Sequence, residues 1–333
     1  MMKSLYMKGL LAAGTVACSM SFGTVMAHAD EKELTLCWAA WDPANALVEL
    51  SKDFETQSGI KMNFEFVPWP NFADRMLNEL NSGGKLCDLM IGDSQWIGGA
   101  AENGWYVKLN DFFAAEGISM DAFVPATVTG YSEWPKNTPN YWSLPAFGDV
   151  VGWTYRKDWF EDPKEMEAFK AKYGYDLAPP APWAQMRDIA EFFHRPEENR
   201  YGAAIYSQGV GDALMMGVEN FIFAYGGSLG DYANYKVTGL LNSPESVEGL
   251  EDYRKLFGFG PPGWGNAFFA EVNTAIAQGQ VAMGMNFFAF FPSLLNEATN
   301  PHAANMGFFA NPPGPRGDDF AALGGQGISL ISY

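Results

Sequence analysis

Residues 34–44 have the sequence LTLCWAAWDPA, and residues 60–70 have the sequence IKMNFEFVPWP. The apolar start of the first stretch (34–39) and the alternating apolar residues of the second each predict a strand. Between them, apolar residues recur at helical spacing from the Trp-Asp-Pro turn until Gly59, which predicts a helix. A strand, a helix and a second strand in this order favour a βαβ unit with parallel strands.

The alternation of strands and helices continues beyond this unit. Residues 72–80 predict a helix that ends at Ser82-Gly83-Gly84, residues 88–91 predict a short strand, and Asp93-Ser94 predicts the start of a further helix. Strands that alternate with helices form parallel sheets with helices on both faces. We therefore expect an α/β fold.

Three successive predicted strand ends carry a tryptophan in the following turn, at residues 40–43, 68–70 and 92–96. Ligands of parallel sheets bind beyond the carboxyl ends of the strands. An indole ring offers a flat apolar face to a sugar ring, and Asp, Asn and Gln side chains pair with hydroxyl groups. These turns are therefore candidate binding loops.

The N-terminus has the features of an export signal. Lys3 and Lys8 flank the start of a short apolar stretch, and Ala27-His28-Ala29 supplies the small residues that a signal peptidase needs. We expect residues 1–29 to be a signal peptide, which predicts a periplasmic protein. Cys18 follows Thr-Val-Ala and offers an alternative lipoprotein site, but the apolar residues after it favour the cleaved, soluble form.

The mature chain is strongly acidic. Without Lys3 and Lys8, 19 of the 21 basic residues remain against 39 acidic ones, which gives a net charge of −20. Such a surface disfavours nucleic acid and anionic membranes as partners. Hydrophobic residues make up 48% of the sequence, as in a folded chain, and the length fits two domains. We expect a monomer.

Two cysteines remain in the mature chain, Cys37 and Cys87, each in or beside a predicted strand. Export would place them in an oxidising compartment, where disulfides form. If the two strands are neighbours in one sheet, a disulfide between these residues is geometrically possible. Two buried free thiols are the equally open alternative, because cysteine is among the most buried residue types.

The sequence lacks the motifs of common catalytic and metal sites. His194 and His302 are not at ligand spacing with a cysteine or another histidine, and neither a nucleophile elbow nor a phosphate-binding loop occurs. We therefore expect no enzymatic activity, no cofactor and no metal. A carboxylate pair for glycoside hydrolysis stays open, because such residues come from distant loops.

Several motifs resemble those of family 1 extracellular solute-binding proteins, the binding components of ABC importers, of which maltose-binding protein is the best known. They are the stretch FETQSGIK at 54–61, Pro68-Trp69, DLMIG at 88–92, YWSLP at 141–145 leading to WTYRKD at 153–158, and GQVAMG at 279–284. The resemblance covers essentially the whole mature chain, and the order of the motifs carries its weight.

This resemblance implies two α/β lobes, each a largely parallel sheet flanked by helices, with a solute cleft between them that closes by hinge motion. It places the first lobe at residues 30–146, the second at 147–322 and a return crossover at 323–333. It also implies a small-molecule solute, namely a sugar, oligosaccharide or polyol. A membrane permease and an ATPase are the implied partners.

The same resemblance assigns candidate ligand-binding residues to loops of both lobes. They are Trp41, Asp42, Asp93, Gln95, Trp96, Asp149, Gln208, Asp212, Trp264, Asn286, Phe287 and Gln326. Helix capping is an equally open role for Asp42, Asp93 and Ser94. Most aromatic residues belong to the core, including all but one of the run at 287–291, and Met215-Met216 is expected to pack there as well.

Two features depart from the family pattern. The return crossover carries Gln326 after Gly324-Gly325, where the family often has an aromatic residue, so an aromatic platform is not expected there. The sequence also stops at residues 328–333, within the strand that this crossover predicts. We expect it to be a C-terminally truncated fragment of a longer protein.

Three other functions remain open at this point. Clustered tryptophan faces also hold quaternary amines, although the neighbouring Asp42, Asp93 and Gln95 favour a sugar. A secreted glycan-processing enzyme would need two facing carboxylates in the cleft. A sensor subunit that reports to a receptor is the third alternative.

Overall fold

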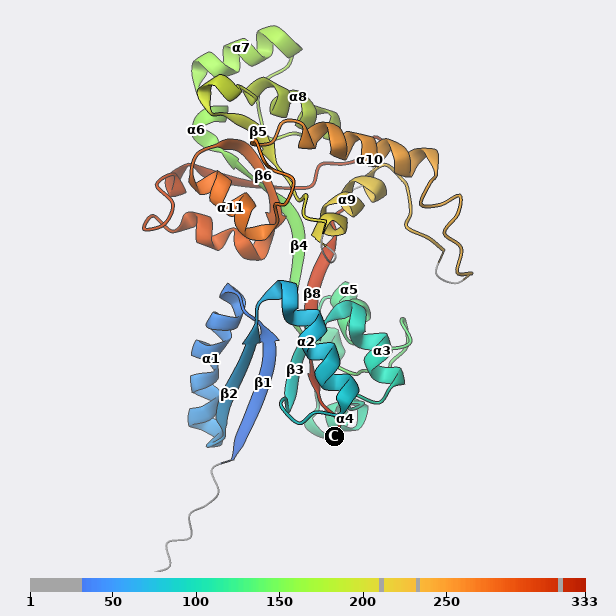
Figure 1. The fold of residues 1–333 in the computed structure, drawn as a ribbon. Helices are drawn as coiled ribbons and strands as arrows, with labels where there is room; N and C mark the ends of the chain where they lie inside the picture. The colour runs from blue at the N-terminus through green and yellow to red at the C-terminus, as the bar shows by residue number, and fades with distance from the viewer. Residues whose placement is uncertain (1–31, 210–212, 232–233, 317–319) are drawn as a thin grey trace, which may run out of the picture.

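Two α/β lobes, joined by two long strands, make up the computed structural model, which describes residues 32–209, 213–231, 234–316 and 320–333 (Figure 1). The predicted signal peptide at 1–29, with Cys18, lies outside these residues, as does Asp212. Within the described part, one eight-stranded sheet has seven strands in the order β2-β1-β3-β8-β4-β6-β5, and its eighth strand, β7, pairs with β4. The two-lobed α/β architecture expected from the sequence is confirmed.

The first lobe is built on three parallel strands with β1 in the middle. The strands are β1 (Glu33–Ala39), β2 (Lys61–Val67) and β3 (Leu89–Asp93). The helices are α1 (Asp42–Ser58), α2 (Trp69–Ser82), α3 (Ile97–Glu102), α4 (Asn110–Glu116) and α5 (Pro125–Tyr131), with 3-10 turns η1 (Ser94–Trp96) and η2 (Met120–Ala122).

The predicted βαβ unit, formed by β1, α1 and β2, is confirmed, and the helix that follows it begins earlier than predicted. Helix α1 ends where expected, because Gly59 adopts the left-handed conformation with φ 68° that few other residues tolerate. Helix α2 begins at Trp69 and not at residue 72. Pro70 does not prevent this, because N–H groups in the first turn of a helix have no acceptor within the helix, so the N–H that proline lacks is not needed there.

Strands β4 (Leu144–Arg156) and β8 (Leu323–Leu330) run from one lobe to the other (Figure 1). The first part of β4 pairs with β8, and β8 pairs on its other side with β3, so that β8 is a central strand of the first lobe. From Val151 onward, β4 pairs with β6 and β7 in the second lobe. Pairings that involve β4 or β8 are antiparallel, so each lobe combines parallel and antiparallel pairs.

The second lobe surrounds β5 (Tyr201–Ala204), β6 (Val281–Phe287) and β7 (Met306–Ala310). Its helices are α6 (Lys157–Phe160), α7 (Pro163–Tyr173), α8 (Trp183–Phe193), α9 (Ala213–Ala224), α10 (Pro244–Phe257) and α11 (Phe269–Ala277). Its 3-10 turns are η3 (Pro196–Glu198), η4 (Phe288–Phe290), η5 (Pro292–Leu295) and η6 (Ala303–Asn305). All seven residues of β6 are buried, which makes it the centre of this lobe's apolar core.

A disulfide joins Cys37 of β1 to Cys87, which lies just before β3, with the two Cα atoms 5.7 Å apart. The bond is possible because β1 and β3 are neighbours in the sheet, where Cys37 pairs with Met90. Both cysteines are buried in the core of the first lobe. Of the two alternatives for these cysteines, the structure contains the disulfide.

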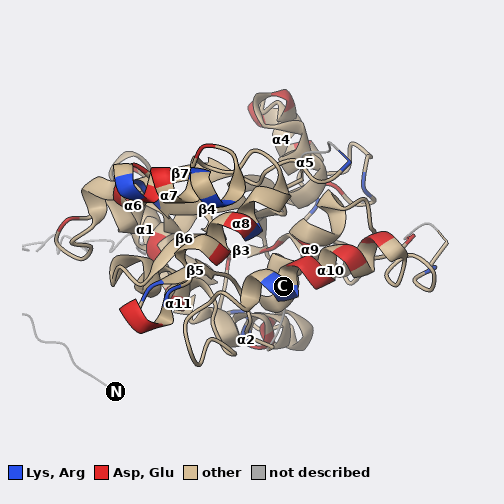
Figure 2. Ribbon diagram, turned by 90° about the horizontal axis from the view of Figure 1, so that it is seen from above, with Lys and Arg blue, Asp and Glu red and all other residues tan. Residues whose placement is uncertain are grey.

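Charged residues are distributed over the outer elements of the molecule. Figure 2 shows acidic residues recurring along α10, with basic residues scattered among the surrounding helices. No helix in the described residues is both long and apolar enough to cross a membrane.

Candidate functional site

A cavity lies where the two lobes face each other, and it consists of two adjoining chambers. The first chamber has a volume of about 420 Å³ and is lined from β1, α1 and α2 on one side and from α11 and η4 on the other. The second chamber has a volume of about 480 Å³ and reaches the crossing strands β4 and β8. Both volumes are in the range of small-molecule binding sites.

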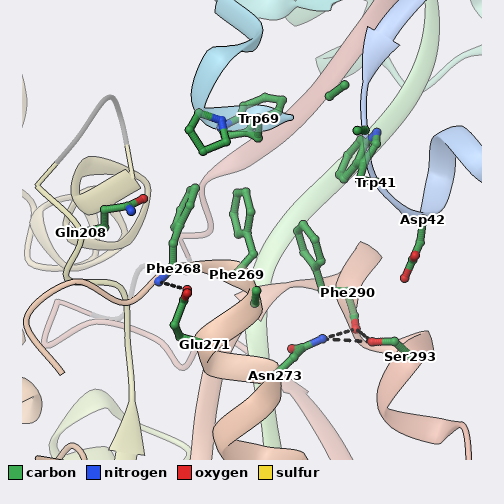
Figure 3. Close-up of a pocket in the computed structure, with 14 residues that line it drawn as sticks. Trp41, Asp42, Trp69, Gln208, Phe268, Phe269, Glu271, Asn273, Phe290 and Ser293 are labelled. Atoms are coloured by element: carbon green, nitrogen blue, oxygen red, sulfur yellow. Dashed lines mark hydrogen bonds between the residues drawn. The ribbon is translucent and has the colours of Figure 1, made fainter. Parts of the chain in front are cut away.

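Four aromatic rings line both chambers and separate one from the other. Trp41 and Trp69 come from the first lobe, and Phe269 and Phe290 come from the second. Their ring centroids are 5.8 Å apart for Trp41 and Phe290 and 6.3 Å apart for Trp69 and Phe269. Figure 3 shows the tryptophans on one side of the gap and the phenylalanines on the other. The cavity thus offers flat apolar faces from both lobes.

The two tryptophans reach the cavity for the same structural reason. Trp41 is the residue before α1, directly after β1, and Trp69 is the first residue of α2, directly after β2. Because β1 and β2 are parallel, their carboxyl ends meet at one edge of the sheet. The indole N–H of Trp41 is buried and has no acceptor among the described residues, so it is a donor that a bound molecule can satisfy.

The second chamber has a polar floor on β8. Gln326 is 3% exposed, and its Oε1 accepts a hydrogen bond of 2.5 Å from the indole N–H of Trp38. With Oε1 so engaged, the amide nitrogen of Gln326 is the group left to donate into the chamber. Asp93 of β3 is the register partner of Gln326, and Asp149 of β4 is the partner of Gly324.

Asp149 occupies the point at which β4 leaves the first lobe. Its Oδ1 accepts from the N–H of Val150 at 2.8 Å, and its two oxygens accept from the N–H of Ala289 at 3.3 and 3.2 Å. Burial nevertheless raises the pKa of Asp149 to about 6, because these backbone hydrogen bonds only partly replace lost water. The carboxyl group therefore titrates close to neutral pH.

Close packing of β8 against both lobes depends on two glycines. A side chain at Gly324 would collide with the ring of Phe287. Gly325 has φ 138°, and a side chain there would collide with the backbone oxygen of Phe147. The hydroxyl of Tyr131 donates to the carbonyl of Gly324. Burial raises the pKa of Tyr131, and the nearby carboxylates of Asp149 and Asp93 raise it further.

The first chamber has polar side chains that are partly held by neighbours. Glu271 Oε2 accepts from the N–H of Phe268 at 2.9 Å, which caps α11. The Asn273 amide donates to Phe290 O at 2.7 Å and to Ser293 Oγ at 3.0 Å (Figure 3). These bonds fix the position of η4, and with it the ring of Phe290.

The structure brings eight of the predicted binding residues to the cavity. The first chamber is lined by Trp41, Asp42 and Gln208, and the second by Asp93, Gln95, Asp149, Phe287 and Gln326, with Trp41 shared. Neither Asp42 nor Asp93 makes a side-chain capping hydrogen bond to its helix. The capping alternative for these two residues therefore receives no support.

Three predicted residues do not line the cavity. Trp96 is only 9% exposed and packs in the first lobe's core against Phe72. The indole N–H of Trp264 donates to Ile205 O at 2.7 Å, and its ring borders a separate hollow in the second lobe. Asn286 is fully buried and accepts from the Tyr206 hydroxyl at 2.6 Å. Asn286 thus supports the site from within the core.

Several lining residues were absent from the sequence-based set, although the strand-end rule could have found one of them, Trp69. Trp69 follows its strand in the same way as Trp41. The predicted core pair Met215-Met216 instead lines the second chamber on α9, together with Glu219. Further lining residues that only the three-dimensional packing reveals include Phe147, Leu229, Phe268, Phe269, Glu271, Asn273, Phe290 and Ser293.

The sequence model of the family described as bacterial extracellular solute-binding protein matches residues 40–333. The chain belongs to this family. A binding protein of Brucella abortus (strain 2308) is 25% identical over 316 residues, which is 93% of this chain and 69% of the relative. A probable ABC transporter-binding protein of Deinococcus radiodurans is 23% identical over 57% of this chain and 43% of its own length.

Solved structures of other solute-binding proteins share the fold. One from Agrobacterium radiobacter K84, in complex with ribitol, has a TM-score of 0.77 at 22% identity and covers 91% of this chain and 72% of its own. One from Agrobacterium vitis S4, with D-mannitol, has a TM-score of 0.73 at 16% identity over 90% and 68%. Maltose-bound MalE3 of T. maritima has a TM-score of 0.74 at 19% identity over 90% and 72%.

Proposed function

We propose that this solute-binding protein captures a sugar, oligosaccharide or polyol between its lobes and delivers it to an ABC importer. One observation carries the proposal: indole and phenyl faces from both lobes enclose a cavity with carboxylate and amide side chains at its ends. Apolar faces suit the C–H surfaces of a sugar, and carboxylates and amides suit its hydroxyl groups. Ribitol, D-mannitol and maltose in the proteins of similar fold support the same class.

The position of the cavity supports hinge closure as the mode of capture. The lining residues belong to both lobes, whereas the lobes are connected by the crossing strands β4 and β8. A solute in contact with both lobes stabilises the closed arrangement relative to an open one. The closed form is then the one that meets the permease on the periplasmic side of the membrane, and the ATPase of the importer drives uptake from the other side. No solute is chemically changed.

Isothermal titration of the mature protein with sugars, polyols and quaternary amines tests this function. We expect saturable binding of a sugar or polyol, and chromatography of the recovered solute should show no conversion. W41L should weaken binding at least about tenfold, since it removes an aromatic face and the unpaired N–H. W105L is the matched control, because Trp105 packs beside the first lobe's core and lines neither chamber.

Two results would contradict the proposal. Tightest binding by a quaternary amine without hydroxyl groups would replace the carbohydrate class with that amine. Conversion of a bound glycan would make the protein an enzyme.

A further inference from the structure

The two chambers are lined by acidic side chains and, among the described residues, by no Lys, Arg or His. Asp42 and Glu271 belong to the first chamber, and Asp93, Asp149 and Glu219 belong to the second. The internal segments outside the description, 210–212, 232–233 and 317–319, contain no basic residue in their sequence. The described lining of the site therefore carries negative charges and no positive ones.

Two of these carboxylates lie on opposite sides of the strand that forms the floor of the second chamber. Asp93 lies opposite Gln326 on one side of β8, and Asp149 lies opposite Gly324 on the other side. Positions 324 and 326 share a face of the strand, so both carboxyl groups are on the same face of the sheet. Asp93 and Asp149 are two strand spacings apart across the sheet and two residues apart along β8, which places their Cα atoms about 12 Å apart. Both side chains can then reach one functional group between them.

Gln326 shows independently that this floor is built to hold a polar ligand. The side chain is 3% exposed, and the indole N–H of Trp38 fixes its oxygen, so the amide orientation is set. Its nitrogen has no hydrogen-bond acceptor among the described residues, although it borders the chamber. A ligand oxygen that accepts from Gln326 lies next to Asp93, its register partner, and Asp149 is two residues further along β8 on the other side.

Closure over a solute removes water from these carboxylates. Asp93 accepts from the Gln95 amide at 3.1 Å, and Asp149 accepts from the N–H of Val150 and of Ala289. A neutral solute adds hydroxyl donors to these hydrogen bonds but brings no countercharge. A cationic group supplies charge-assisted hydrogen bonds, and the faces of Trp41 and Trp69 attract the same charge. A solute with a carboxylate or phosphate group brings a further negative charge next to these carboxylates, which disfavours its binding.

We propose that the solute is an amino sugar or an aminated polyol whose protonated nitrogen lies in the second chamber between Asp93 and Asp149. This inference rests on the proposed carbohydrate function and narrows its substrate class. The carbon skeleton lies against the four shared aromatic rings, and a hydroxyl or ring oxygen accepts from the Gln326 amide.

Calorimetric titration with matched pairs of solutes tests this inference. The pairs are D-glucose and D-glucosamine, D-galactose and D-galactosamine, D-mannose and D-mannosamine, and D-glucitol and 1-amino-1-deoxy-D-glucitol. We expect the aminated member of at least one pair to bind about tenfold or more tightly than its neutral partner. This advantage should shrink when the ionic strength is raised to about 0.5 M.

Two double variants locate the amine. In D93N/D149N the advantage of the aminated solute should fall to within about twofold, since neutral amides replace both carboxylates. E49Q/D53N removes the same number of charges from exposed positions on α1 and should retain the advantage. Thermal melts of both variants verify that they are folded.

The outcomes separate the inference from the proposed function. If every pair that binds favours its neutral member or shows no preference, the inference is wrong and the carbohydrate function stands. Retention of the preference in D93N/D149N likewise overturns the assigned position of the amine. If no sugar or polyol of either kind binds to the folded protein, the proposed function fails and this inference fails with it.

Discussion

Gln326 presents its amide nitrogen to the second chamber only because Trp38 holds the amide oxygen. We predict that W38F weakens solute binding at least about fivefold, because the amide loses its fixed orientation. It should also lower the free energy of unfolding by about 1–3 kcal/mol, since a buried oxygen is left without a donor. Calorimetric titration and urea unfolding measure the two effects.

A matched variant separates orientation from stability. Trp153 in the second lobe is fully buried, and its indole N–H donates to Asn311 Oδ1 at 2.8 Å, away from both chambers. W153F therefore removes the same kind of bond and should cost a similar unfolding free energy without changing affinity. Equal losses of affinity in the two variants would show that Trp38 has no specific role in binding.

Asp149 gives the protein a definite pH dependence of stability. Its pKa is about 6 in the folded protein against an ordinary value of 3.8, so the folded state binds this proton more tightly than the unfolded state does. The stabilisation is fully present below about pH 4 and is lost as the pH rises through about 6. A shift of about two pKa units corresponds to about 3 kcal/mol.

D149N isolates this contribution, because the asparagine keeps an acceptor oxygen but does not titrate. Between about pH 4 and pH 7, the unfolding free energy of the wild type should fall by about 3 kcal/mol relative to that of D149N. Urea unfolding at several pH values measures the difference. Parallel curves for the two proteins would show that Asp149 titrates normally.

Individual residues of the site could be predicted from the sequence only where a simple rule relates a residue's place in a predicted element to the cavity. Trp41 and Asp93 follow parallel strands, and the rule that ligands bind at strand ends finds them. The same rule fails for Trp96, because the 3-10 turn after β3 directs this ring into the core against Phe72. The position of Asn286 could not be predicted, because no local sequence pattern distinguishes an amide in a buried hydrogen-bond network from one that contacts a ligand.

At the scale of elements, the disulfide closes a loop around the first βαβ unit. It joins residues 50 positions apart in the sequence. Constraining an unfolded loop of this size is worth about 4 kcal/mol in the chain-entropy account. We predict that C37A/C87A lowers the unfolding free energy by about 2–5 kcal/mol, as measured by urea unfolding.

Reductant supplies the internal control for this prediction. It should destabilise the wild type to about the level of C37A/C87A and leave that variant unchanged. Solute affinity, measured where both proteins are folded, should stay within about twofold, since neither cysteine lines a chamber. An unchanged unfolding midpoint in C37A/C87A would mean that the crosslink contributes no net stability.

The elements of the first lobe are the most predictable part of the fold. Gly59 and Gly83 end their helices in left-handed conformations, and hydrophobic periodicity defines the strands between. The second lobe is less accessible to this reasoning, because β6 is buried along its whole length and shows no alternation. Its partner β4 comes from more than 120 residues away in the sequence, and no local signal specifies that pairing.

At the scale of the whole molecule, the lobes touch through the aromatic rings that also line the cavity. The pairs are Trp41 with Phe290 and Trp69 with Phe269. Contacts of this kind are each worth about 0.5–1.5 kcal/mol beyond the area that they bury. They therefore bias the solute-free protein toward the arrangement seen in the structure, in which the two lobes are in contact through these rings. A partly closed resting state lowers the free energy that a solute must supply to complete closure.

We predict that F269A/F290A shifts the solute-free protein toward an open state. Loss of both ring pairs removes about 1–3 kcal/mol of closing energy, which lowers the closed-to-open ratio by about 5- to 150-fold. Small-angle X-ray scattering without solute should then give a larger radius of gyration for F269A/F290A than for the wild type.

F112A is the control for this prediction. Phe112 is an exposed residue on α4 in the first lobe, and the ring contact described for it is with its neighbour Phe113. An unchanged radius in F269A/F290A, with both variants folded, would mean that the crossing strands alone set the angle between the lobes. In that case solute binding could not act by completing a closure that these rings begin.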